Sequence, residues 1–356
     1  MSFDSMSPME IFENSRESIE SKESISKSSI PISGLLIENY FDFIHISVAT
    51  KEKKYCGWSI RDLDECVEDD EDMETIVIGD TVFPHFENQG SQLELYHDDI
   101  SLGAISLLKY LFEVFTGPIL DASFLTATIP NPRISRFLVD CFHLNSIRNC
   151  EKLMLYENGI SSKNMIDQIL DLASGVKNLD FRCPLPDDWR NPKILKVDKL
   201  LAWPAEWFTT TDLLINLDCE CVSINETNLK WQSFKAFMLK WAMSEDTRLK
   251  VLEISFDGNW EGFNHDGLEV KDWDPEERDS HYPDIMLGKR EWFNCEFASD
   301  ILRKDGLLAS FWRKEHSFHF VVWHDRHPIA TLHPDPEQLI KMEDLEFVEE
   351  EEEEDE

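Results

Sequence analysis

The second half of the chain repeats a short hydrophobic pattern that predicts parallel strands. Four segments have the form apolar-x-x-apolar-x-apolar, and their starts are 26, 43 and 30 residues apart. A weaker copy at Ile194, Val197 and Leu200 lies inside the longest gap. This pattern is typical of the strand of a leucine-rich repeat, for which the usual period is ~20–29 residues. The four segments begin at Cys150, Val176, Cys219 and Leu249.

Helical periodicity fills the gaps between these segments. Residues 162–173 and 228–244 both carry apolar side chains at helical spacing, with Ser161 as the predicted N-cap of the first helix and Gly175 as its stop. Parallel strands that are joined by helices bury each other's apolar sides by stacking. We therefore predict an α/β fold that forms an irregular leucine-rich-repeat-like solenoid. Because the period is uneven, a plain irregular α/β sheet is the alternative.

Further elements are predicted outside the repeats. Leu307–Trp312 and Phe318–Trp323 are typical of two antiparallel strands, and this hairpin would close the end of the sheet. Residues 257–289 are rich in Gly, Asp, Pro and His and are predicted to be a loop. In the first half we expect strands at Tyr40–Val48, Thr75–Ile78, Gln92–Tyr96 and Leu120–Thr126, and helices at Asp99–Phe115 and Ser135–Phe142.

Composition divides the chain into three expected regions. Residues 1–34 are rich in Ser and Glu and are predicted to be an N-terminal segment that either forms one or two short helices or is disordered. Residues 35–333 carry the periodic patterns and are expected to form one α/β domain. Residues 334–356 are polar and end in a run of acids, which predicts a disordered acidic tail.

The charge balance limits the range of partners. The chain has 71 acidic and 34 basic residues, a formal net charge of −37. Asp62–Glu74 holds nine of the acids and Glu343–Glu356 holds eleven. A negative field repels phosphate backbones and anionic lipid, so nucleic acid and membranes are not expected partners, whereas basic proteins are permitted. Without a secretory signal or an apolar run of membrane-spanning length, we expect an intracellular protein of the cytoplasm or nucleus.

Chemistry-bearing motifs are sparse. The sequence has no glycine-rich phosphate loop and no G-x-S-x-G elbow, and its eight cysteines include no C-x-x-C pair. We expect reduced, buried thiols, no catalytic or cofactor-binding residues and no cofactor. Strand alternation sends clustered histidines to different faces, so we expect no metal site among them. These histidines are His316, His319, His324, His327 and His333.

Residues 194–256 and a later segment carry a family resemblance. The order and spacing of these motifs are similar to the F-box-associated type 2 region, found in a family greatly expanded in roundworms. The resemblance covers the chain from about Leu35 to Trp323. The residues that carry it are Val197–Leu200, Trp207–Thr209, Leu213–Leu214, Leu217–Cys219, Val222–Ile224, Phe234–Trp241, Leu249–Ile254 and Asp300–Ala309.

This resemblance implies a role in ubiquitin ligation without catalysis. Members of the family usually begin with an F-box, which docks on the Skp-type adaptor of a cullin–RING ligase, while the rest captures a substrate. Here Ser5–Ser15 resembles the second half of an F-box, and half a module has too little core to fold alone. The docking residues that the resemblance implies are Met6, Pro8, Met9, Ile11 and Phe12.

The repeat pattern also predicts where a partner would bind. The variable positions of each repeat strand would line the inner face of a curved sheet, and such faces commonly bind proteins. Tyr156 and Arg182 are the expected anchors, because Tyr and Arg are favoured at interfaces; the alternative is a plain solvated face. An acidic leucine-rich-repeat-like protein that binds basic partners such as histones is the second functional hypothesis. The candidate face consists of Lys152, Met154, Tyr156, Asn178, Asp180, Arg182, Ser223, Asn225, Glu253 and Ser255.

Overall fold

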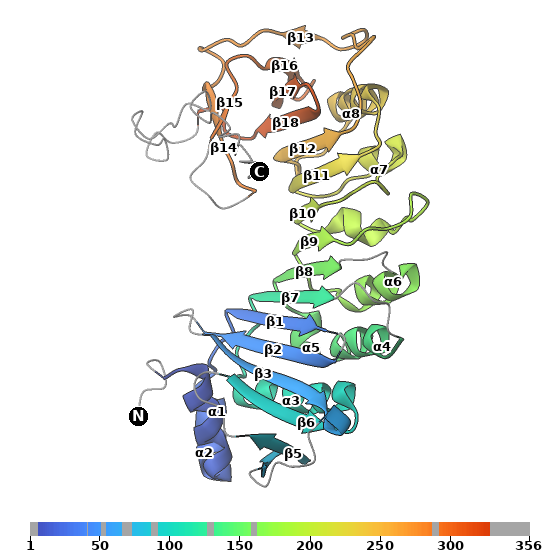
Figure 1. Ribbon diagram of the computed structural model, residues 1–356. Helices are drawn as coiled ribbons and strands as arrows, with labels where there is room; N and C mark the ends of the chain where they lie inside the picture. The colour runs from blue at the N-terminus through green and yellow to red at the C-terminus, as the bar shows by residue number, and fades with distance from the viewer. Residues whose placement is uncertain are drawn as a thin grey trace, which may run out of the picture.

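A computed structural model shows a mixed α/β fold built on one large sheet (Figure 1). The structure describes residues 6–40, 42–50, 55–65, 73–86, 92–126, 132–157, 162–286 and 292–327. Within these residues, sixteen strands form one sheet in the order β13-β16-β17-β18-β12-β11-β10-β9-β8-β7-β1-β2-β3-β6-β5-β4, and β14 and β15 form a separate pair. The acidic run after Asp62 falls largely outside the described residues.

The middle of the sheet consists of six parallel strands that lie side by side in sequence order. The predicted repeat strands are confirmed, and the weaker copy contributes a short strand of its own. The six strands are β7 (Asp121–Thr126), β8 (Lys152–Glu157), β9 (Asn178–Arg182), β10 (Lys199–Ala202), β11 (Cys221–Thr227) and β12 (Val251–Phe256).

The connections between these strands lie on one side of the sheet, to the right in Figure 1. Parallel neighbours need a crossover, and each crossover here brings its apolar side chains back onto the same face. The predicted cap Ser161 lies outside the described residues, and Ser162 occupies the N-cap position of α6 without a side-chain hydrogen bond. The crossover elements are α4 (Pro132–Cys141), α5 (Asn145–Arg148), α6 (Lys163–Leu172), the 3₁₀ helix η3 (Pro192–Lys196), α7 (Thr211–Ile215) and α8 (Trp231–Met243).

The core lies between the sheet and these helices. Two rows of side chains run in register across the parallel strands, and all of them are 4% exposed or less. Because every second residue of a strand faces the helices, the repeated apolar positions of the sequence become continuous buried rows. The first row is Leu153, Leu179, Leu200, Val222 and Leu252, and the second is Leu155, Phe181, Ala202, Ile224 and Ile254.

The N-terminal part extends the sheet with mixed strand directions. The helix α3 (Ile100–Val114) covers it, and Asp99 caps this helix by accepting a hydrogen bond from Leu102 N at 3.0 Å. Two further helices, α1 (Pro8–Glu17) and α2 (Ile19–Lys27), pack against α3. The strands are β1 (Gly34–Asn39), β2 (Phe43–Ala49), β3 (Tyr55–Asp62), β4 (Glu74–Ile78), β5 (Thr81–Phe86) and β6 (Gln92–His97), with the short 3₁₀ turn η2 (Leu63–Glu65) after β3.

The C-terminal part confirms the predicted hairpin and corrects two expectations. The strands β17 (Leu308–Lys314) and β18 (Ser317–Trp323) are antiparallel, and β18 pairs with β12. The hairpin does not end the sheet, because β16 (Ser299–Leu302) and β13 (Val270–Lys271) continue beyond β17. The predicted loop 257–289 is only partly loop. It contains β13 and also β14 (His281–Pro283), which pairs with β15 (Trp292–Asn294).

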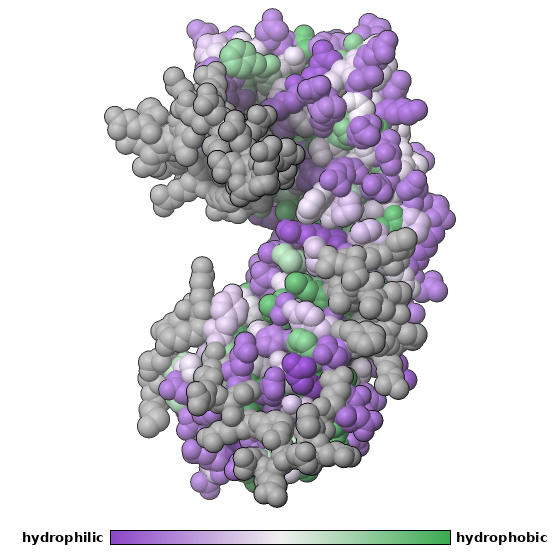
Figure 2. Space-filling model, viewed as in Figure 1, coloured by the Kyte–Doolittle hydropathy of each residue, from purple (hydrophilic) through white to green (hydrophobic). Residues whose placement is uncertain are grey.

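The strands follow one another along an arc, and the molecule is hollowed on the side opposite the helices (Figures 1 and 2). Throughout the described residues, no helix combines the length and apolar character needed to cross a bilayer.

Candidate protein-binding face

The helix-free side of β8 to β12, called the open face below, carries the ten predicted binding residues. Strand alternation places them opposite the two buried rows, and the strand register aligns them across the sheet. One row consists of Met154, Asp180, Leu201, Ser223 and Glu253. A second row begins with the neighbouring residues Tyr156 and Arg182. Most of these side chains are half-buried, as expected for a sheet face that no helix covers.

The charges of the open face are largely neutralised within the chain. Arg182 donates two hydrogen bonds to the Asp180 carboxylate, at 2.9 and 3.0 Å. The bonded carboxylate raises the pKa of Arg182 above its ordinary value, although burial opposes this shift. Lys152 pairs with Asp121 at 3.2 Å on the neighbouring strand. The two bonds to Asp180 restrict the Arg182 guanidinium to one orientation, and its planar group can stack on a planar group of a partner.

Trp203 is a face residue that sequence reasoning missed. It follows the buried Ala202 at the end of β10, and its N–H donates to the Phe181 carbonyl at 3.0 Å, which continues the ladder beside Arg182. Its side chain is 47% exposed, unusually high for a tryptophan. No signal in the sequence identified it, because only the pairing of Leu200 with Leu179 in the structure aligns Trp203 with Arg182.

A flap covers one end of the open face. We use this name for residues 278–286 and 292–298, which pack against β10, β11, β12, β17 and β18. Tyr282 and Met286 of the flap belong to a small apolar cluster that buries Cys221 and Val251, and Lys199 donates to the Ile285 carbonyl at 2.7 Å. The predicted face is therefore covered near the amino ends of β10, β11 and β12 and is open at the carboxyl ends of these strands.

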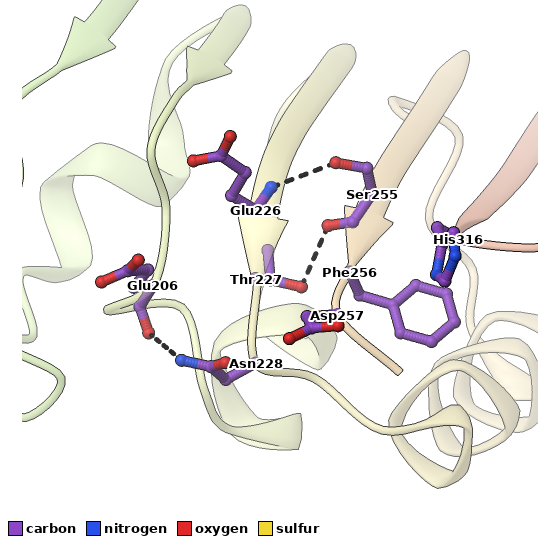
Figure 3. Close-up of a pocket in the computed structure, with 8 residues that line it drawn as sticks. All are labelled: Glu206, Glu226, Thr227, Asn228, Ser255, Phe256, Asp257 and His316. Atoms are coloured by element: carbon purple, nitrogen blue, oxygen red, sulfur yellow. Dashed lines mark hydrogen bonds between the residues drawn. The ribbon is translucent and has the colours of Figure 1, made fainter. Parts of the chain in front are cut away.

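A cavity of about 430 Å³ adjoins the uncovered end (Figure 3). Ser255, one of the predicted face residues, lines it, and its hydroxyl accepts a hydrogen bond from Glu226 N at 3.0 Å. Three of the residues that line this space carry carboxylates, namely Glu206, Glu226 and Asp257, and within the described chain none of them forms an ion pair with a lysine or arginine. The lining residues are Glu206, Glu226, Thr227, Asn228, Ser255, Phe256, Asp257 and His316.

The structure buries most of the docking residues that the family resemblance implies. Ile11 and Phe12 are 1% and 0% exposed, and Phe12 packs edge-on against Trp58 and Tyr110. Pro8 is also buried, while Met6 and Met9 are half-buried against the same core. In this conformation Ile11 and Phe12 support the protein's own fold, so α1 would have to detach before they could contact an adaptor.

The described histidines and cysteines lie in surroundings that do not favour metal binding or thiol ionisation. Within the described residues, no group of three or more His, Cys, Asp or Glu side chains is arranged to hold a metal ion. His319 stacks on Trp312 at 4.8 Å, His324 bonds the Leu249 carbonyl at 2.9 Å, and His333 lies outside the described residues. The seven described cysteines are buried thiols, and burial raises the pKa of Cys219 to about 12, which keeps it a thiol at neutral pH.

Comparison with known proteins finds distant relatives. The uncharacterized Caenorhabditis elegans protein F59B2.9 is 25% identical over 238 residues, which cover 65% of this chain and 54% of that protein. A second uncharacterized protein of that organism, F59B2.8, is 25% identical over 271 residues, 70% of this chain and 59% of the relative. The chain thus spans about half the length of these relatives. The E3 ubiquitin-protein ligase hecw-1 of C. elegans is 22% identical over 272 residues, 69% of this chain and 21% of the ligase. No protein-family model and no solved structure matches the chain.

Proposed function

We propose that this chain is a non-enzymatic protein-interaction module that captures a partner on its open face. One observation carries this proposal: Tyr156 of β8, Arg182 of β9 and Trp203, which directly follows β10, come from three adjacent strand positions and remain partly exposed. Tyrosine, tryptophan and arginine are the residues that contribute most often to interface hot spots. Tyr156 and Arg182 stand on strands and Trp203 is joined to β9 by a backbone hydrogen bond, so little conformational entropy is lost when they bind.

The module is proposed to be a leucine-rich-repeat-like solenoid of the F-box-associated type, which presents its partner to a ubiquitin ligase. Supporting this, six parallel strands follow one another in sequence order, and all their crossovers lie on one side. A stretch similar to most of this chain also occurs within one ubiquitin-protein ligase. Docking on a Skp-type adaptor would have to use exposed parts of α1 and α2, since Ile11 and Phe12 are buried.

Site-specific photo-crosslinking tests the binding face. A benzoylphenylalanine in place of Tyr156 should form a crosslink to a partner in native cells. The same group in place of Met243, which is 84% exposed at the end of α8 on the helical side, is the control and should form none. Crosslinks from position 243 but not from position 156 would contradict the proposal. Co-purification of the crosslinked complex with a Skp-type adaptor and cullin tests the ligase role, and absence of both refutes it.

The chain's charge favours a second candidate function, that of an acidic protein that binds basic partners such as histones. The formal net charge is −37, and eleven of the acids lie in Glu343–Glu356. Deletion of residues 343–356 should then abolish binding to purified core histones at physiological salt. Histone binding that survives the deletion unchanged would reject this candidate.

A further inference from the structure

We infer that the open face takes an extended partner segment that carries a lysine or arginine next to an apolar or aromatic residue. This inference rests on the proposed function, because it names the chemistry of the partner at the same face. Adjacent strands lie about 4.8 Å apart, so the row from Tyr156 to Trp203 spans about 10 Å. Roughly three residues of an extended chain cover that distance.

Within the described residues, the open face offers a partner no unpaired positive charge. Its basic side chains are already engaged: Lys152 with Asp121, Arg182 with Asp180, and Lys199 with the flap carbonyl.

The carboxylates at the uncovered end of the row remain free of such partners. Glu206, Glu226 and Asp257 are exposed, and within the described chain no lysine or arginine pairs with them. Charge complementarity therefore selects a cationic side chain and disfavours an acidic one.

The row and the cavity are continuous. Trp203 bonds the carbonyl of Phe181, which precedes Arg182, and Ala205, two residues after Trp203, donates to the Asn225 carbonyl at 2.9 Å. Asn225 directly precedes Glu226 at the cavity wall. Ser255 belongs to both the predicted face and the cavity lining. A segment that places an apolar or aromatic side chain over Trp203 can thus direct its next cationic side chain toward the carboxylates.

Two physical effects favour a cation at this place. The electron-rich faces of Trp and Tyr rings attract a cation. Hydrogen bonds from an ammonium or guanidinium group to a carboxylate are stronger than bonds between neutral groups. A phosphorylated or otherwise acidic segment would be repelled by these carboxylates and by the overall charge of −37.

Selection from a phage-displayed library of random 12-residue peptides on the immobilised full-length chain tests the inference. We expect the selected peptides to carry Lys or Arg within a few residues of an aromatic or apolar residue. Resynthesised, fluorescently labelled peptides should bind at least tenfold more weakly to Trp203→Ala and to the triple variant Glu206→Gln/Glu226→Gln/Asp257→Asn. Circular dichroism and thermal unfolding confirm that each variant is folded.

A matched control removes the same amount of charge elsewhere. Asp212, Glu245 and Glu269 are exposed, and none lines the cavity. The variant Asp212→Asn/Glu245→Gln/Glu269→Gln should keep the affinity of the unmodified chain, and so should a chain without residues 343–356, which excludes capture by the acidic tail. Peptides in which the basic residue is replaced by norleucine should bind at least tenfold more weakly.

Three outcomes would overturn the inference: selected peptides without basic residues, affinity unchanged in the triple variant, or no selected peptide at all. The variant Tyr156→Ala distinguishes failure of this inference from failure of the proposed function. If this change weakens peptide binding while the triple variant does not, the binding face stands and the basic partner is wrong. If neither weakens binding, both proposals fail, and the absence of any selected peptide counts against both as well.

Discussion

One buried arginine fixes the flap to the sheet. Arg278 is 0% exposed, and its guanidinium donates to the Asp300 carboxylate at 2.8 Å and to the Cys295 carbonyl at 2.9 Å. Ser310 donates to the same carboxylate at 2.6 Å and accepts from Trp323 Nε1 at 2.7 Å. The guanidinium also lies 5.1 Å from the Trp323 ring. The positive charge of Arg278 can stay buried because it is paired and hydrogen-bonded. These bonds hold the flap in one position relative to the sheet.

Substitution of this arginine should be costly. Arg278→Met leaves Asp300 buried without its counter-charge, so we expect the free energy of unfolding to fall by about 3–5 kcal/mol. Urea denaturation followed by tryptophan fluorescence measures this change. Lys304→Met, at an exposed lysine of the same region that forms no ion pair within the described chain, should change the free energy by less than about 0.5 kcal/mol. Equal effects of the two changes would show that the buried pair has no special role.

At the scale of elements, the first helix is part of the core and not an appendage. Phe12 of α1 contacts Trp58 of β3 at a ring distance of 5.1 Å and Tyr110 of α3 at 5.9 Å. Ser15 adds a hydrogen bond to Phe12 O at 2.6 Å and lies 3.0 Å from the Tyr110 hydroxyl. The helices α1 and α2 thus pack against the core of the strands and the helix that follow them in the chain.

Truncation of Phe12 tests the role of α1. Phe12→Ala removes a fully buried ring, and such changes lower the free energy of unfolding by about 3–5 kcal/mol. Chemical denaturation monitored by circular dichroism measures the loss. Ile19→Ala in α2 is the control, since Ile19 is 79% exposed and its truncation should cost less than about 0.5 kcal/mol. A Phe12→Ala variant as stable as the control would show that α1 contributes no core.

Local pattern predicted the elements that bury one regular face. The repeat strands and α3, α6 and α8 were found because their apolar residues recur with the period of the element. The flap was missed because its buried contacts depend on distant partners: Tyr282 rests on Trp323 at a ring distance of 5.0 Å, and Arg278 reaches Asp300. Trp203 was missed for a related reason, since only the register of β9 and β10 shows that it adjoins Arg182.

The whole molecule is an open array in which each parallel strand is supported by its two neighbours. The last parallel strand, β12, is covered along its free edge by β18 through five residue pairs from Val251–Val321 to Ser255–Ser317. Without β18, the backbone of β12 would be unpaired along this edge. The α8 residues Phe234 and Phe237 would also lose their contacts with Phe318 and Phe320 and become exposed.

Shortening the chain tests this dependence. A chain that ends at residue 256 lacks β13 to β18, so we expect it to aggregate and to bind a hydrophobic dye strongly. Size-exclusion chromatography and dye fluorescence, both compared with the full chain, measure the two effects. A truncated chain that elutes at its expected size and binds no more dye would show that the array ends independently at β12.

The two outer strands of the large sheet are unequal, and this limits how copies of the molecule could join. The described part of β13 has two residues, too few to accept a new strand firmly, whereas β4 has five. A chain with usable edges at both ends could polymerise head to tail into a fibre. Two copies could pair through their β4 edges, but β13 is too short for a third copy to add to the sheet. Edge pairing would therefore stop at a dimer and would not produce a filament.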